Sequence, residues 1–156
     1  MNRIKQQYDI AFNNTFLSCN FKIMNGNDII FFDGLCNLCN GAVQFTIERD
    51  KSNVFRFASL QSDYANQKLK PFNIEPSEGN SFVLLEGEKV YQRSTAALRV
   101  ARKLTGLWPL LYGFIVVPPF IRDGVYSYIA KNRYKWFGKQ ESCWVPTPEL
   151  KSKFLD

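Results

Sequence analysis

The feature that most constrains the fold is a change of hydrophobic period near residue 34. Residues 28–32, DIIFF, are a short run of β-branched and aromatic side chains that ends at Asp33-Gly34, which is typical of a buried strand. Residues 37–50 then carry apolar side chains at the i, i+4 spacing of a helix. A strand that passes directly into a helix predicts the first half of a βαβ unit.

The rest of the chain extends this pattern into a small sheet. We expect a strand at 53–60, a helix at 62–70 that stops before Pro71, a hairpin within 81–94, a helix at 95–104 capped by Ser94, and helical segments at 108–116 and 119–131. The βαβ unit makes its strands parallel, and the hairpin adds antiparallel ones. The predicted fold class is therefore α/β, a small mixed sheet flanked by helices with a C-terminal helical appendix from about residue 107.

Length and composition predict a single domain. The chain has 156 residues, of which 46% are hydrophobic and 22% charged, as in ordinary soluble proteins. Residues 1–25 show neither period and are predicted to be a weakly ordered or surface extension of a domain at 26–156. No secretory signal is recognisable, and the apolar stretch 107–121 is too short and proline-rich to cross a bilayer, so we expect a cytoplasmic protein.

The absence of histidine narrows the chemistry. It excludes Ser/His and Cys/His nucleophile pairs and every metal site that needs an imidazole. The 14 Phe residues predict a bulky core that needs no cofactor for its stability, and none is expected. The net charge of +6 favours acidic partners without naming one.

Two of the four cysteines, Cys36 and Cys39, lie at the predicted start of the first helix. A helix N-terminus stabilises a thiolate through its unpaired N–H groups and its partial positive charge. The i, i+3 spacing brings both sulfurs to one side of the first turn. We predict that Cys36, nearer the helix end and more exposed, attacks a disulfide, and that Cys39 resolves the mixed disulfide.

Other interpretations of the pair remain open. The cysteines can be two small buried residues at a strand–helix junction. They can also supply half of a zinc site, which Cys19 and Cys143 would have to complete. Asp33 is either a carboxyl group of raised pKa that exchanges a proton with Cys39, or a turn residue that accepts local backbone N–H groups.

The motif Asp33-x-x-Cys36-x-x-Cys39 resembles the signature of the DCC family of predicted thiol-disulfide oxidoreductases. The stretches FRFASLQS, YQRSTAALRVARKL, VYSYIAKNRYKWFG and CWVPTPELKSKFLD resemble further family blocks, so the likeness spans roughly residues 28–156. It implies a thioredoxin-like fold in which Cys36 and Cys39 are the redox pair and Asp33 is the accompanying acid. The implied partner is a protein or small thiol or disulfide, with glutathione or a thioredoxin system as electron donor.

The same resemblance implies a substrate-binding role for Arg93 and Ser94. They stand where the hairpin enters the next helix, near the partner site of glutaredoxin-like folds, and Arg93 can pair with a substrate carboxylate such as that of glutathione. An ordinary surface arginine is the alternative. Residues 79–81 lack the proline that thioredoxins carry before the third strand, which puts thioredoxin-like substrate binding in doubt.

Residues 128–139, YIAKNRYKWFGK, alternate aromatic and basic side chains. Such a stretch can bind single-stranded nucleic acid or an anionic membrane, but we interpret it as a packed helix end with a solvated basic face. No nucleic-acid partner is expected. Three functions therefore remain: a thiol-disulfide oxidoreductase, which we favour, a non-catalytic thioredoxin-like binding module, and a structural zinc protein.

Overall fold

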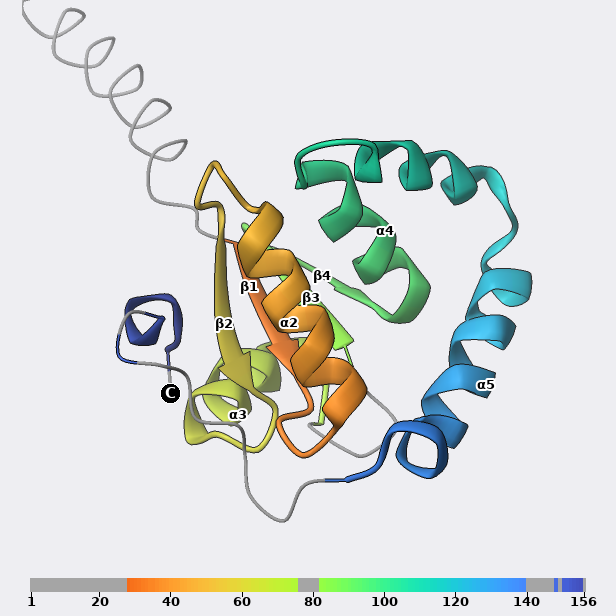
Figure 1. Cartoon of the computed structure of the whole chain (residues 1–156). Helices are drawn as coiled ribbons and strands as arrows, with labels where there is room; N and C mark the ends of the chain where they lie inside the picture. The colour runs from red at the N-terminus through yellow and green to blue at the C-terminus, as the bar shows by residue number, and fades with distance from the viewer. Residues whose placement is uncertain (1–27, 76–81, 140–147, 149, 156) are drawn as a thin grey trace, which may run out of the picture.

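The fold is organised around one central strand, β1 (Asp28–Phe32), which has a partner on each side. The computed structural model describes residues 28–75, 82–139, 148 and 150–155 (Figure 1). Its sheet has the order β2-β1-β3-β4, with β2 at Phe55–Ser59, β3 at Phe82–Glu86 and β4 at Lys89–Gln92. β1 runs parallel to β2 and antiparallel to β3, and β3 and β4 form a hairpin. The predicted mixed α/β sheet is confirmed.

Helices cover both faces of this sheet. The helical segments are α2 (Asn37–Arg49), α3 (Asp63–Leu69), η1 (Lys70–Phe72), α4 (Arg93–Lys103), η2 (Trp108–Val116), α5 (Pro119–Phe137) and η3 (Lys151–Lys153). α2 and α4 pack on one face and α3 on the other, which is the layering expected of a thioredoxin-like fold. α5 leads from η2 back to the beginning of α2 (Figure 1).

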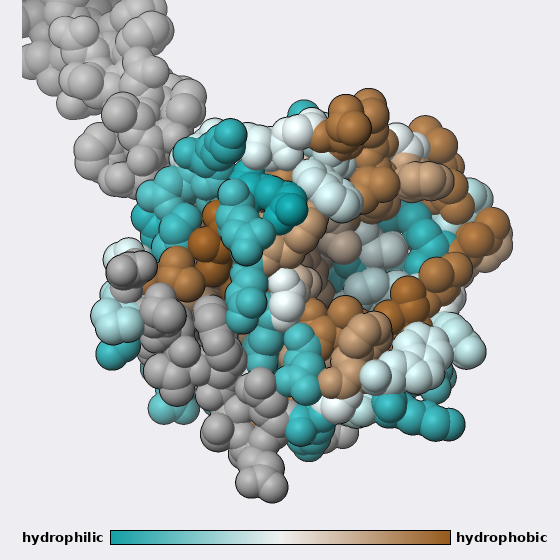
Figure 2. All heavy atoms as spheres, viewed as in Figure 1, coloured by the Kyte–Doolittle hydropathy of each residue, from teal (hydrophilic) through white to brown (hydrophobic). Residues whose placement is uncertain are grey.

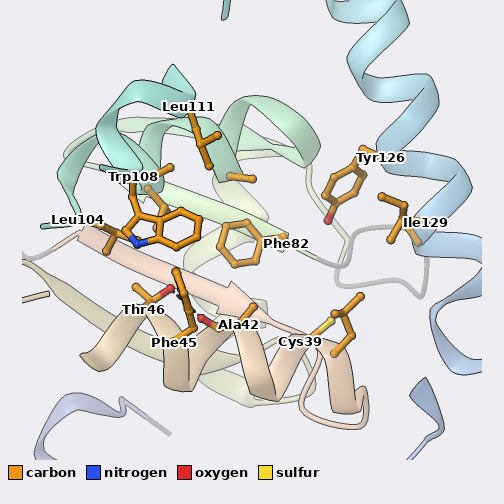
Figure 3. Close-up of a pocket in the computed structure, with 15 residues that line it drawn as sticks. Cys39, Ala42, Phe45, Thr46, Phe82, Leu104, Trp108, Leu111, Tyr126 and Ile129 are labelled. Carbon is orange, nitrogen blue, oxygen red and sulfur yellow. Dashed lines mark hydrogen bonds between the residues drawn. The ribbon is translucent and has the colours of Figure 1, made fainter. Parts of the chain in front are cut away.

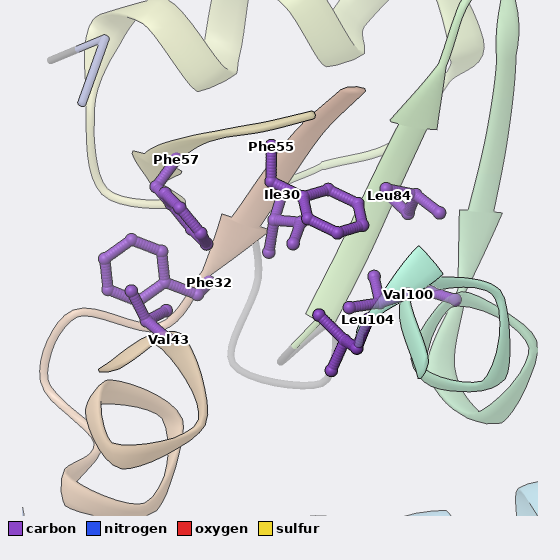
Figure 4. Packing of buried hydrophobic residues seen from close by; sticks show 9 residues of the cluster. Ile30, Phe32, Val43, Phe55, Phe57, Leu84, Val100 and Leu104 are labelled. Carbon is purple, nitrogen blue, oxygen red and sulfur yellow. The ribbon is translucent and has the colours of Figure 1, made fainter. Parts of the chain in front are cut away.

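The alternation of side chains along β1 divides the core into two layers. Ile30 and Phe32 point to the face under α2 and α4, where they meet Phe57 and Leu84 (Figure 4). Phe31, between them in sequence, points to the opposite face and packs in the cluster under α3. Because both faces are buried, β1 has no solvent side and reads as a continuous apolar run.

Two predicted helix boundaries are wrong, because contacts distant in sequence set them. α4 begins at Arg93 rather than at residue 95, and its N-cap is Gln92. Ser94 is not a cap: its hydroxyl donates to Asp123 and accepts from Arg122, both on α5. α5 continues six residues beyond the predicted end at residue 131 and stops before Gly138.

An exposed apolar surface covers η2 and α5. Figure 2 shows hydrophobic side chains gathered at the upper right, over η2 and the beginning of α5. Tyr128, Trp136 and Phe137 are 63%, 50% and 48% exposed, so for these three aromatic side chains the interpretation as a packed helix end is wrong. Tyr128 and Trp136 instead pack against each other on the helix surface. No helix in the described part of the chain is both long and apolar enough to cross a membrane.

The core assignment predicts a large difference between two phenylalanine truncations. Phe57 is fully buried on β2, whereas Phe72 is 38% exposed at the end of η1. We expect Phe57→Ala to lower the free energy of unfolding by about 3–5 kcal/mol, because it leaves a cavity. Phe72→Ala should cost much less. Urea denaturation of both variants measures the difference, and equal losses would contradict this core.

Candidate active site

The two cysteines form the first turn of α2. Cys36 is the N-cap residue, with extended backbone angles, and its Sγ accepts a hydrogen bond from the Cys39 N–H at 3.4 Å. The sulfur therefore takes the place that a serine or aspartate oxygen usually occupies at a helix N-terminus. Both cysteines are free thiols. A thiolate at this position faces the positive end of the helix.

The pKa values of the two thiols are shifted in opposite directions. The hydrogen bond from the Cys39 thiol lowers the pKa of Cys36 to about 6, and the Cys39 N–H and the Arg133 charge act in the same direction against burial. The pKa of Cys39 is raised, because its thiol donates a hydrogen bond to Cys36 and is itself buried. At neutral pH the pair therefore holds one thiolate, on Cys36, and one thiol, on Cys39.

The C-terminal end of α5 covers Cys36. The Nδ2 of Asn37 donates to the Phe137 carbonyl at 2.8 Å, and Cys36 forms an isolated antiparallel bridge with Lys139. Cys36 is consequently 0% exposed and Cys39 8% exposed, so the prediction that Cys36 is the more exposed cysteine is wrong. The position of Cys36 at a helix N-terminus predicted the low pKa of its thiol. Its exposure depends instead on which part of the chain packs over that end of the helix.

Asp33 lies between β1 and α2 and accepts hydrogen bonds on both carboxylate oxygens. Oδ1 accepts from the Leu35 N–H at 3.1 Å and from Gln61 Nε2 at 3.0 Å. Oδ2 accepts from an Arg133 guanidinium nitrogen at 2.8 Å and from the Tyr134 hydroxyl. The predicted turn contact, to Leu35, is therefore present.

The raised pKa that one of the two interpretations gave to Asp33 is not found. Burial by itself raises this pKa, but the hydrogen bonds from Tyr134, the Leu35 N–H and Arg133 outweigh it, so the pKa is lowered. Asp33 is thus a buried carboxylate at neutral pH, only 3% exposed, and is paired rather than poised to give up a proton.

Sequence reasoning missed three side chains that complete this site. Arg133 is 2% exposed and brings a positive charge to Asp33 across 100 residues of sequence. Burial and the hydrogen bond to Asp33 raise the pKa of Tyr134 to about 12, which keeps its hydroxyl protonated as a donor. Gln61 accepts from the Gly34 N–H and from Ser59 while it donates to Asp33. The one sequence signal for these residues was their position in stretches that resemble family blocks: Gln61 lies in FRFASLQS, and Arg133 and Tyr134 lie in NRYKWFG.

Other residues named from the sequence lie elsewhere. Arg93 is exposed at the start of α4 with φ of +53°, and Ser94 is buried in the contact between α4 and α5. Cys19, Cys143 and residues 79–81 lie outside the described residues, as does the 1–25 extension. Among the residues that the structure does describe, no cluster of three or more Cys, Asp or Glu side chains could hold a metal ion.

Comparison with known proteins identifies the family of this chain. Residues 30–139 match the family described as DCC1-like thiol-disulfide oxidoreductase, so the chain belongs to that family. It is 50% identical over 129 residues to the uncharacterized protein YuxK of Bacillus subtilis (strain 168), covering 83% of this chain and 94% of that one. It is 38% identical over 116 residues to the chloroplastic DCC family protein At1g52590 of Arabidopsis thaliana, covering 74% and 67%. No solved structure matches.

The charges around Cys36 predict opposite effects for two substitutions. Arg133→Met should raise the pKa of Cys36, because the guanidinium charge lowers it, and should cost about 3–5 kcal/mol of stability by leaving Asp33 unpaired. Asp33→Asn should lower the pKa of Cys36, because the carboxylate raises it. Lys131→Met, which removes an exposed charge from the same helix, should change neither quantity.

The pKa is measured from the pH dependence of iodoacetamide alkylation, with peptide mass spectrometry to assign the modified cysteine. Melting curves of each variant show whether it remains folded. A shift of the Cys36 pKa in the same direction for Arg133→Met and Asp33→Asn would refute the electrostatic account.

The cover over Cys36 depends on Gly138. Its φ is +80°, a backbone angle that residues other than glycine rarely adopt. A Cβ added at this position would lie 3.2 Å from Asn37 Nδ2. Gly138→Ala should therefore displace the α5 end and speed alkylation of Cys36 at fixed pH. Gly124→Ala, within α5 and with nothing within 4 Å of its added Cβ, is the control. Unchanged alkylation in Gly138→Ala would show that the cover does not limit access.

Proposed function

We propose that the protein is a thiol-disulfide oxidoreductase that exchanges a disulfide through Cys36 and Cys39. The observation that carries this proposal is the Cys36 sulfur at the N-cap of α2, which accepts the Cys39 N–H and has a pKa of about 6. A thiolate is the reactive form of cysteine, and a second thiol one turn away can resolve a mixed disulfide.

The proposed exchange transfers two electrons from the dithiol to the substrate. The Cys36 thiolate attacks one sulfur of the substrate disulfide, forming a mixed disulfide and breaking the substrate S–S bond. Cys39 then loses its proton to the departing substrate thiolate and attacks the Cys36 sulfur. This forms the Cys36–Cys39 disulfide and releases the second substrate sulfur as a thiolate. A dithiol or glutathione as external reductant restores the starting state.

Asp33 takes a positioning role in this proposal. As a carboxylate of lowered pKa it is a poor proton donor, but its hydrogen bonds hold Arg133 and Tyr134 of α5 at the end of β1. The Arg133 charge in turn favours the Cys36 thiolate. Arg93, which is exposed, is proposed to meet a carboxylate of the substrate, whereas Ser94 supports it by fixing the start of α4 to α5.

The burial of Cys36 favours a second candidate function. A sulfur with no exposed surface cannot reach a substrate disulfide until the α5 end moves. A thioredoxin-like binding module, in which the cysteines only stabilise the start of α2, needs no such movement. The two functions differ in whether Cys36 and Cys39 form a reversible disulfide in the folded protein.

A redox titration separates these functions. Purified, metal-free Cys19→Ser/Cys143→Ser protein, which retains only the Cys36 and Cys39 pair, is equilibrated in glutathione buffers and alkylated. We expect a reversible disulfide with a midpoint of about −270 to −200 mV, and half-maximal alkylation of Cys36 near pH 6. The thiolate persists above that pH and is lost below it. Further replacement Cys39→Ser should leave Cys36 able to trap a mixed disulfide.

Two results would reject the oxidoreductase. One is the absence of a Cys36–Cys39 disulfide at every glutathione poise. The other is alkylation of both thiols that stays slow in the native protein at pH 8 and becomes fast only after denaturation. Either result leaves the binding module as the better account.

A further inference from the structure

A pocket of about 350 Å³ lies beside the cysteine pair, between α2, α4, η2 and α5. Figure 3 shows Cys39 at one end of it and Phe45 and Trp108 at the other, with Phe82 between them. Its volume is within the range of roughly 300–1,000 Å³ that is usual for ligand sites. Cys39, and not Cys36, is the cysteine that lines it.

The pocket suits an uncharged group. The described residues that line it carry no charge, and most are aliphatic or aromatic, among them Leu38, Phe45, Phe82, Val100 and Leu111. Thr46, Tyr126, Cys39 and the indole N–H of Trp108 bring the polar side-chain atoms. Glutathione has two carboxylates and an ammonium group, and moving these into such a pocket without partners is costly. The lining therefore favours an apolar side chain over the charged tripeptide.

The pocket is continuous with the exposed apolar surface of η2 and α5. Trp108, Leu111 and Ile129 line the pocket and are also 37%, 38% and 40% exposed. Leu110 and Phe114, also on η2, are 73% and 59% exposed, and Figure 2 shows apolar side chains gathered over this segment. A ligand that enters the pocket can thus continue along this surface. A polypeptide with several apolar side chains is long enough to do so, whereas a compact molecule is not.

We propose that this pocket binds an apolar side chain next to the reacting cysteine of a polypeptide disulfide substrate. The inference rests on the proposed function, because it is the Cys36–Cys39 exchange that requires a sulfur in the ligand. A polypeptide supplies a cysteine and neighbouring aromatic or aliphatic side chains on one chain. A lipid surface also suits the apolar face, but it contains no disulfide to meet Cys36 and Cys39.

The test compares three disulfides of similar sulfur chemistry. They are the disulfide-linked dimers of acetyl-Phe-Cys-Phe-amide and acetyl-Ser-Cys-Ser-amide, and glutathione disulfide. We expect the reduced protein to react at least about ten-fold faster with the Phe peptide than with the other two, since one apolar side chain leaves water.

Ala97→Trp fills the pocket from α4, where residue 97 is exposed and lines the wall. It should reduce the preference for the Phe peptide over the Ser peptide to less than about three-fold. Gln67→Trp, an exposed residue of α3, adds the same indole on the other face of the sheet and should keep the preference. Melting temperatures establish that both variants fold.

The outcomes separate this inference from the function on which it rests. Equal rates with all three disulfides, or a preference that survives Ala97→Trp, would overturn the inference and retain the oxidoreductase. If no disulfide reacts, the oxidoreductase proposal fails. Fluorescence anisotropy of a labelled Phe peptide that contains S-methylcysteine then tests the pocket alone. Binding that is lost in Ala97→Trp supports the pocket as a site for an apolar side chain, and no binding overturns it. The protein is also sedimented with vesicles of equal parts phosphatidylcholine and phosphatidylglycerol. Vesicle binding that is lost in Ala97→Trp, without selectivity among the peptides, would assign the pocket to lipid and overturn the inference as well.

Discussion

The buried ion pair between Asp33 and Arg133 is the interaction on which the site depends. A carboxylate and a guanidinium out of water are costly unless each is paired and hydrogen-bonded, and here Leu35, Gln61 and Tyr134 supply the remaining donors to Asp33. The pair joins the end of β1 to the last turns of α5. Through this ion pair, α5, which lies near the C-terminal end of the sequence, is held against the first turn of α2, where the cysteines lie.

This attachment activates Cys36 and hides it at the same time. Arg133 favours the thiolate, and the chain just beyond it, at Gly138 and Lys139, lies over the sulfur. A thiolate that is stable but inaccessible reacts only when its cover moves. The hydrogen bond from Cys39 is the main cause of the lowered pKa of Cys36, and Arg133 on α5 adds to it, while the end of the same helix limits access to the sulfur.

The two sulfurs face different surroundings. Cys36 lies among charged and polar groups under the end of α5, whereas Cys39 lines an apolar pocket that opens onto η2. The neutral state of Cys39 suits this environment, because a thiol loses little on leaving water and a thiolate loses much. The charges of Arg133 and Asp33 act on both sulfurs, so the two differ in the hydrogen bond that Cys39 gives to Cys36 and in the pocket that only Cys39 lines.

The sequence by itself determined the local structure. β1, α2, the β3–β4 hairpin and the parallel and antiparallel pairing followed from hydrophobic period and turn residues, and the Cys36–Cys39 spacing identified the helix start. Only the tertiary structure decided what surrounds that start. The hydrogen bonds that Gln61, Arg133 and Tyr134 give to Asp33, the burial of Cys36 and the contact of Ser94 with α5 all involve residues 28 to 103 positions away. No local pattern encodes such contacts, because they arise when separate elements pack, and packing sets both the dielectric and the partners of each charge.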